Sequence, residues 1–180
     1  MKRIVAPLGQ DLSKLKAGEI VCLSGLIYTA RDQAHQRLTE ALKKGRKLPV
    51  NLRGQVIYYC GPTARPRGKV IGACGPTTAS RMDDFTPALL KAGLKGMIGK
   101  GRRCREVARA IKKYKAVYFL TYAGCGALLA GYIKKAKPVA YRGLGPEAIH
   151  RLRVKDLPLI VGIDAEGRSI YAKKRRARSR

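Results

Sequence analysis

Three short stretches of the sequence place basic and hydroxyl side chains where a helix is expected to begin. They are "YTARDQAH", "GPTTASRM" and "MIGKGRRC", and they contribute Arg31, Asp32, His35, Thr77, Thr78, Arg81 and Lys100. Backbone N–H groups at a helix N-terminus attract anions, and an arginine guanidinium binds a carboxylate through two parallel hydrogen bonds. The glycines beside Lys100 let the backbone approach a ligand closely. If the three turns converge, they would bind a small dianion.

Each stretch also has a purely structural explanation. Thr77, Thr78 or Ser80 can cap a short helix after the Gly-Pro turn, and Arg31 can form a surface ion pair with Asp32. The Gly-Lys-Gly sequence around Lys100 is not a P-loop, because the upstream glycine spacing and a following Ser or Thr are missing. From these residues alone, an anion site and ordinary helix starts both remain open.

The turns are expected to connect strands and helices that alternate along the chain. Apolar and β-branched runs predict strands at 18–30 (divided by a glycine), 54–62, 68–76, 95–101, 116–122 and 138–143. Apolar residues at helical spacing predict helices at 31–45, 86–93, 102–114, 127–136 and 146–152. A hairpin is expected at 157–172, with its turn at Asp164–Gly167. The pattern predicts a mixed α/β domain whose strand-to-helix turns are the usual place for a ligand site.

The composition describes a globular but very basic chain. Its 180 residues are 46% hydrophobic, which excludes general disorder, and the formal net charge is +28. The last eight residues, "KKRRARSR", form a basic tail. Such a charge is expected to attract polyanions, with nucleic acid as the obvious candidate, through the surface and the tail. A lysine-rich solvated surface or an acidic partner subunit would explain the charge equally well.

The five cysteines are widely spaced, with no Cys-x-x-Cys pair and no Cys/His cluster. This spacing predicts neither a disulfide framework nor an autonomous metal site, and it indicates reduced thiols in a cytoplasmic protein. Residues 116–133 are uncharged over a membrane-spanning length, but they divide into a strand, a glycine turn and a helix. No transmembrane helix is predicted.

Six motifs in order give the chain a family resemblance. "LSGLIYTARDQAH", "IYYCGP", "GACGPTTASRMDDF", "GMIGKG", "GLGPEAI" and "PLIVGIDAEGRSIY" closely resemble the β subunit, or C-terminal domain, of class I fumarases and L(+)-tartrate dehydratases. The resemblance runs from about Gly18 to Tyr171. It implies a swivelling β/β/α three-layer domain at 1–172, with a parallel central sheet and a second antiparallel sheet. Residues 173–180 are then expected to be a basic disordered tail.

The resemblance implies a hydro-lyase that hydrates fumarate to malate or dehydrates tartrate. Its [4Fe–4S] cluster would be bound by three cysteines of a partner α subunit and by none in this chain. The β subunit would therefore be active only with an α subunit, in an α2β2-type hetero-oligomer. Cys60, Cys74 and Cys125 are accordingly expected to be packing residues.

The resemblance also suggests roles for individual residues. It assigns substrate-carboxylate binding to Arg31, Arg81 and Lys100, and it proposes Thr77 as the catalytic base, assisted by an aspartate of the partner. Thr78 is included among the substrate-binding residues. A threonine hydroxyl is a very poor base unless it is activated, so His35, with a better pKa for proton transfer, is a second catalytic candidate. Glu147 is expected to be structural.

Two functions of other classes compete with this hypothesis. The charge and the tail favour a basic nucleic-acid-binding protein, and a non-catalytic homologue of the β subunit would carry the same motifs. The choice between fumarate and tartrate stays open, because the contacts that distinguish them can lie on either subunit.

Overall fold

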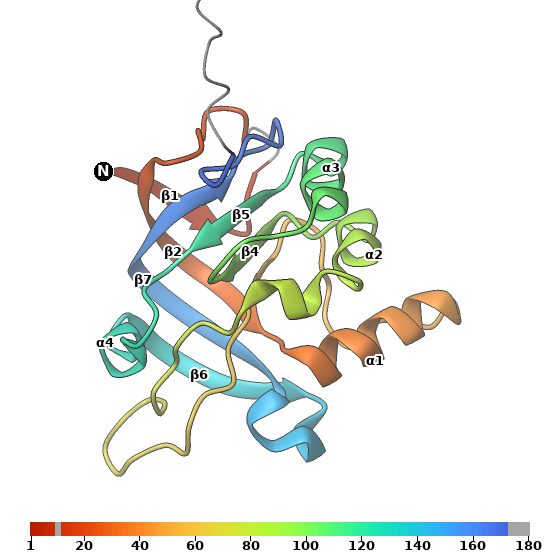
Figure 1. Cartoon of the computed structure of the whole chain (residues 1–180). Helices are drawn as coiled ribbons and strands as arrows, with labels where there is room; N and C mark the ends of the chain where they lie inside the picture. Colours follow the sequence, from red (N-terminus) through yellow and green to blue (C-terminus); the bar gives the residue numbers. More distant parts are fainter. Residues whose placement is uncertain (10–11, 173–180) are drawn as a thin grey trace, which may run out of the picture.

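The computed structural model describes residues 1–9 and 12–172 of the chain (Figure 1). The strands are β1 (Lys2–Ala6), β2 (Ile20–Thr29), β3 (Val56–Tyr58), β4 (Gly96–Gly99), β5 (Val117–Leu120), β6 (Ile133–Ala140) and β7 (Ile149–Ile163). The helices are α1 (Asp32–Lys43), α2 (Thr86–Lys91), α3 (Arg105–Tyr114) and α4 (Gly126–Ala130), with two short 3-10 helices, η1 (Ala79–Met82) and η2 (Arg142–Glu147). The tail predicted at 173–180 lies outside the described residues.

The strands within the described residues form one mixed sheet in the order β1-β2-β3-β4-β5-β7-β6. Strands β1 to β5 pair in parallel, whereas β7 runs antiparallel to β5 and β6. Strand β7 also pairs antiparallel with β2, so β2, β3, β4, β5 and β7 close into a ring. The predicted mixed α/β class is confirmed. The antiparallel strands are, however, hydrogen-bonded into the same sheet as the parallel ones, and the swivelling arrangement stays a prediction.

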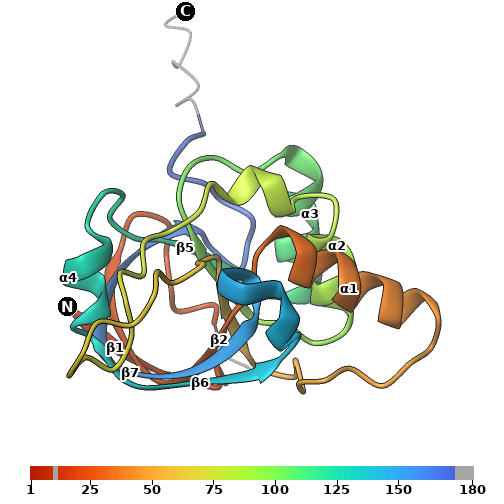
Figure 2. The same cartoon turned by 90° about the horizontal axis from the view of Figure 1, so that it is seen from below.

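Two apolar cores lie on the two faces of the sheet. Along β4 and β5 successive side chains alternate between them: Met97 and Tyr118 join one core, and Ile98 and Phe119 join the other. This alternation follows from the two-residue repeat of a strand. Figure 2 shows α1, α2 and α3 together on one side of the sheet and α4 apart from them. Because both faces are covered, every residue of β4 and β5 is buried.

Strand β2 is continuous where the sequence suggested two strands divided by a glycine. The glycine is Gly25, which has φ 113° and marks a shift in the register between β2 and β7. A Cβ at this position would lie within 2.2 Å of Ala6 O in β1, so no other residue fits here without moving the backbone.

The strand predicted at 68–76 is wrong, because residues 59–77 form an irregular connection between β3 and η1. Its two arms are bonded to each other, with Thr63 N donating to Ala73 O and Ala73 N donating to Thr63 Oγ1. Cys74 N donates to Gly126 O at the start of α4. These local bonds replace the ladder that a strand would need.

The helix predicted at 146–152 is also wrong. Gly145 has φ 57° and is followed by a proline, η2 ends at Glu147, and Ile149 begins β7. The helix predicted at 127–136 is shorter than expected, since α4 ends at Ala130 and Ile133 begins β6. In both places the pairing of β6 with β7 overrides the local pattern.

The helices predicted at 31–45, 86–93 and 102–114 are confirmed as α1, α2 and α3. The predicted turn at Asp164–Gly167 is confirmed by a hydrogen bond from Gly167 N to Asp164 O. The second arm of that hairpin is reduced to a bridge between Ile163 and Ser169. Across residues 1–9 and 12–172, no helix is both long and apolar enough to cross a membrane.

Candidate functional site

The three predicted turns meet at one edge of the sheet. Strands β2, β3 and β4 are parallel neighbours, so their carboxyl ends lie at the same edge. Arg31 follows β2, and Lys100 follows β4. Between them the chain after β3 is held by hydrogen bonds from Ala30 N to Tyr58 O and from Tyr59 N to Ile98 O. The sequence-predicted turns therefore share one site although they lie far apart in the chain.

Thr77 and Thr78 lie beside Lys100. Thr78 and Lys100 form a parallel β-bridge, Lys100 N donates to Thr77 O at 3.2 Å, and Ala79 N donates to Lys100 O at 2.9 Å. Gly99 makes this close approach feasible, because a Cβ there would lie 3.0 Å from the Tyr59 ring and 3.1 Å from Ala79 Cβ. The backbone thus fixes both threonines next to the lysine.

The threonine hydroxyls do not cap the helix that follows. Helix η1 begins at Ala79, and its N-cap residue, Thr78, makes no side-chain capping hydrogen bond. Among the described residues, neither the hydroxyls of Thr77 and Thr78 nor the ammonium of Lys100 has a hydrogen-bond partner. The capping explanation is therefore wrong, and three polar groups at this edge are available to a ligand.

The two arginines belong to one network of ion pairs. Arg31 Nη2 lies 3.6 Å from Asp32 Oδ2 and 3.7 Å from Glu147 Oε1. Arg81 Nε donates to Asp32 Oδ1 at 2.8 Å. Glu147 also accepts a hydrogen bond from Gln33 N at 2.9 Å, in the first turn of α1. Asp32 therefore links Arg31 and Arg81, and Glu147 stabilises the start of α1, consistent with its expected structural role.

The Arg31 side chain crosses the backbone at Gly61. A Cβ at Gly61 would lie 3.0 Å from Arg31 Nη1, 3.1 Å from its Cδ and 3.2 Å from Pro146 O. Arg31 Nε is buried and has no hydrogen-bond partner within the described part of the chain. A buried donor without a partner is unfavourable by about 1–3 kcal/mol. The guanidinium is thus held in a fixed place with a donor still unpaired.

His35 is fully buried in α1, behind Arg31. Its Nδ1 lies 2.8 Å from Arg31 O, and its ring meets the Tyr59 ring edge-on with centroids 5.2 Å apart. Burial lowers the pKa of His35 to about 4, so the ring is neutral near pH 7. Because no surface of His35 is exposed, a substrate cannot contact it in this conformation. His35 therefore contacts the backbone of Arg31 and is not exposed at the open edge of the sheet.

Sequence reasoning missed a buried arginine beneath the site. Arg103 Nε donates to Asp83 Oδ1 at 2.6 Å, and its Nη2 donates to Thr86 Oγ1 at 2.6 Å. Its guanidinium carbon lies 5.4 Å from the Tyr59 ring centroid and 5.1 Å from that of Tyr118. Asp83 also accepts a hydrogen bond from Cys104 N. This network joins the segment after Lys100 to the segment after Arg81, and no sequence spacing signals it.

The thiols of this chain do not suit an iron–sulfur cluster. Cys60 and Cys74 are buried with their sulfurs 2.8 Å apart, and the neighbouring thiol together with burial raises the pKa of Cys60 far above its usual range. Cluster ligands are thiolates, usually four for each cluster. Among the residues that the structure describes, no group of three or more Cys, His, Asp or Glu side chains could hold a metal ion. Cys60 and Cys74 are packing residues, as predicted, and Cys125 is partly exposed.

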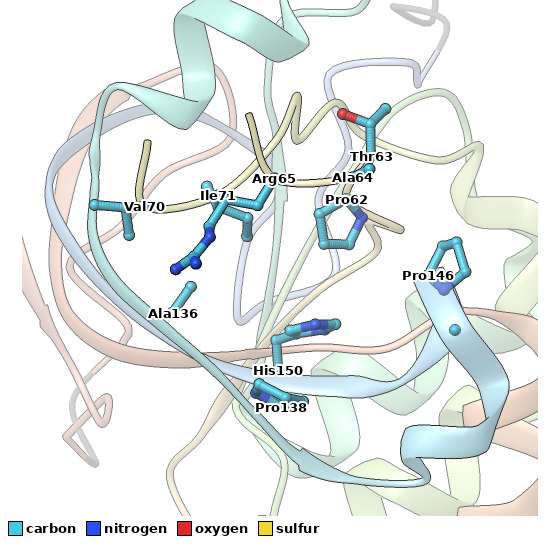
Figure 3. A pocket seen from close by; sticks show the side chains of 11 residues that line it. Pro62, Thr63, Ala64, Arg65, Val70, Ile71, Ala136, Pro138, Pro146 and His150 are labelled. Carbon is cyan, nitrogen blue, oxygen red and sulfur yellow. The ribbon is translucent and has the colours of Figure 1, made fainter. Parts of the chain in front are cut away.

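A cavity of about 480 Å³ adjoins the site (Figure 3). It lies between the connection after β3, represented by Pro62 and Arg65, and the β6–β7 pair, represented by Pro138 and His150. Pro146, next to Glu147, forms one end of it. None of the sequence-predicted site residues lines this cavity.

Comparison with known proteins identifies the family. Residues 4–174 match the family described as Fumarase C-terminus. The chain belongs to this family. The resemblance found in the sequence motifs is thereby confirmed over nearly the whole chain.

Individual relatives differ in how much of their length this chain covers. A Methanocaldococcus jannaschii protein, provisionally named an L(+)-tartrate dehydratase subunit beta, is 40% identical over 168 residues, which cover 90% of this chain and 86% of the relative. The Escherichia coli L(+)-tartrate dehydratase subunit beta is 34% identical over 98% of this chain and 90% of its own length. The aerobic class I fumarate hydratase of E. coli is 37% identical over 95% of this chain but only 31% of its own length. The chain thus spans most of a tartrate dehydratase β subunit and under a third of a class I fumarate hydratase.

Proposed function

We propose that this chain is the β subunit of a hydro-lyase that hydrates fumarate to malate or dehydrates tartrate. The observation that carries the proposal is the meeting of Arg31, Arg81 and Lys100 at one sheet edge. Fumarate and tartrate, the substrates in the relatives' names, each carry two carboxylates, and a site with three cations suits such a dianion.

In the proposed reaction, Arg31 and Arg81 bind and orient the carboxylates, and Lys100 adds a third positive charge. Removal of a proton next to a carboxylate builds negative charge on that carboxylate. Cations that are already fixed there stabilise this transition state more than the ground state. The Asp83–Arg103 network and Gly61 would support this function by holding the cations in place.

We assign the proton-acceptor role to Thr77 and a hydrogen bond to the substrate to Thr78. A threonine hydroxyl needs a basic neighbour to accept a proton efficiently. The family resemblance suggests that an aspartate of a partner subunit provides it. His35 receives a positioning role, because it is buried and bonded to Arg31 O.

The chain's own donor set supports the partner assignment. The described residues do not fit a [4Fe–4S] cluster, so the proposal gives the cluster to an α subunit and derives no step through it. The relatives named as subunit beta support a partner of this kind. An α2β2-type assembly and a cytoplasmic location are further parts of the proposal.

An anaerobic reconstitution experiment tests the proposed function. The full chain is purified alone and together with an α-type partner, and the iron content and the turnover of fumarate and L(+)-tartrate are measured. We expect iron and turnover only in the assembled enzyme. Iron bound stably by this chain alone would contradict the partner assignment. An assembled, iron-loaded pair that is inactive on both substrates would favour the non-catalytic homologue.

A further inference from the structure

A basic groove lies along the β6–β7 pair and shares Arg65, Val70 and Ala136 with the cavity of Figure 3. It encloses about 730 Å³, and seven of its eleven lining residues are Lys or Arg, with no acidic residue among them. Arg65 and Lys69 reach it from the connection after β3. Figure 3 shows Arg65 and Val70 of that connection facing Ala136 of β6. None of the site residues Arg31, Arg81 and Lys100 lines the groove.

The strand register gathers like charges in this groove. Lys135 of β6 lies directly opposite Arg153 of β7, and Lys137 lies opposite Arg151. All four side chains are exposed. Like charges that face each other across a strand pair destabilise the sheet. The arrangement is therefore unfavourable for folding unless a bound anion neutralises it.

Protection of the sheet edge explains only part of this charge. Strand β6 is at the edge of the sheet, and lysines on an edge strand prevent pairing with another chain. Strand β7, however, is paired on both sides, with β2 on one side and with β6 and then β5 on the other. Arg151 and Arg153 therefore protect no edge, and neither do Arg65 and Lys69. Edge protection therefore does not explain all the cations that line the groove, and we infer that they bind an anionic ligand.

The lining indicates which polyanion fits. The apolar residues of the groove are Leu26, Val70 and Ala136, and no aromatic side chain lines it. Without aromatic rings the groove offers no stacking platform for unpaired bases. It also offers little apolar area for a folded acidic protein. Rows of Lys and Arg suit the regularly spaced phosphates of a nucleic-acid backbone, which are bound without reading sequence.

We propose that this groove, lined by Lys135, Lys137, Arg151, Arg153, Arg65 and Lys69, binds the phosphodiester backbone of a nucleic-acid duplex. Binding releases counterions from the phosphates, so the affinity depends steeply on salt and weakly on sequence. This second function is independent of the proposed hydro-lyase activity, because the two sites share no residue.

A matched pair of double variants tests the proposal. K135Q/R153Q removes one opposed pair from the groove, and K44Q/K47Q removes two exposed cations beyond the far end of α1, which Figures 1 and 2 both place away from the connection after β3. Both variants keep the full chain and its tail and change the net charge equally. Binding of a labelled short DNA duplex, an RNA duplex of the same sequence and polyglutamate is measured by fluorescence anisotropy over a salt series.

We expect K135Q/R153Q to bind a duplex about tenfold or more weakly at about 0.1 M salt, and its plot of log K against log salt to be shallower by about 2. The control should bind within about twofold of the wild type. Binding to either duplex with this difference supports the proposal. The Tm of K135Q/R153Q should not fall, because a repulsive pair has been removed. Equal losses in both variants, no duplex binding, or equally tight binding of polyglutamate would each overturn it.

Discussion

Replacement of Arg81 by lysine separates the shape of the guanidinium from its charge. Arg81 uses its Nε to bond Asp32 Oδ1 at 2.8 Å, and the side chain is 51% exposed. The two terminal nitrogens therefore stay available for a substrate carboxylate. Lysine keeps the positive charge but cannot form two parallel hydrogen bonds in the plane of a carboxylate.

The size of the effect follows from these contacts. A hydrogen bond to a charged group contributes about 1.5–3 kcal/mol, and Arg81→Lys loses at least one such bond to the substrate. We therefore expect kcat/KM to fall by about tenfold or more, which corresponds to roughly 1.4 kcal/mol. The lost pair with Asp32 is partly exposed and should lower the free energy of unfolding by no more than about 1 kcal/mol. Activity should thus fall while the fold is nearly unaffected.

The assay uses the enzyme assembled with its α-type partner, with fumarate and L(+)-tartrate as substrates. Arg46→Lys is the matched control, because Arg46 is exposed beyond the end of α1 and should change neither kcat/KM nor stability. Thermal unfolding of both variants shows whether the subunit is intact. If Arg81→Lys has the kinetics of the control, Arg81 does not bind the substrate and the reasoning fails.

Three further changes test the supporting structure. Gly61→Ala would place a Cβ 3.0 Å from Arg31 Nη1 and should raise KM several-fold, because the guanidinium is displaced. The control is Gly143→Ala, whose Cβ would meet nothing within 4 Å and should leave KM unchanged. Equal KM values for the two variants would refute this role of Gly61. Asp83→Ala leaves the buried Arg103 without its carboxylate and should lower the free energy of unfolding in urea by about 3 kcal/mol or more, whereas the exposed Asp84→Ala should have little effect. Burial lowers the pKa of His35 from 6.5 to about 4, so the unfolded chain takes up its proton first as the pH falls. The stability from neutral His35 is then complete above about pH 6.5 and is lost towards about pH 4, by up to about 3 kcal/mol, and His35→Gln should remove this part of the pH dependence of urea unfolding.

The sequence predicted the elements with a strong local signal. The helix at 31–45 has its apolar face and a final glycine, and α1 ends at Lys43 with Gly45 at φ 62°. The failures lie where strand pairing prevails over local preference. "PEAIHRL" has a proline that suits a helix start, yet Ile149 and the residues after it pair with β6, and from Arg151 on they also pair with β2. The sequence of one segment alone does not show which strands it will pair with.

The site could be predicted only in part, for a similar reason. Parallel strands bring the turns after β2 and β4 to one edge, so the closeness of Arg31 to Lys100 follows from the topology. The pairing of Asp83 with Arg103 follows from neither spacing nor periodicity, because it depends on how α2 packs against α3. The burial of His35 could not be predicted from the sequence either, because helical spacing does not show that the Tyr59 ring covers this face of α1.

The most direct measurement is kcat/KM of the assembled enzyme carrying Lys100→Gln. Within the described residues the Lys100 ammonium bonds to no other group, so the substitution removes no structural contact and the Tm should stay unchanged. If Lys100 binds a substrate carboxylate, kcat/KM on the preferred substrate should fall by about 10- to 100-fold, whereas Lys91→Gln, an exposed lysine at the end of α2, should leave it unchanged. Full activity of Lys100→Gln on both fumarate and L(+)-tartrate would contradict the proposal that this edge of the sheet binds the dicarboxylate.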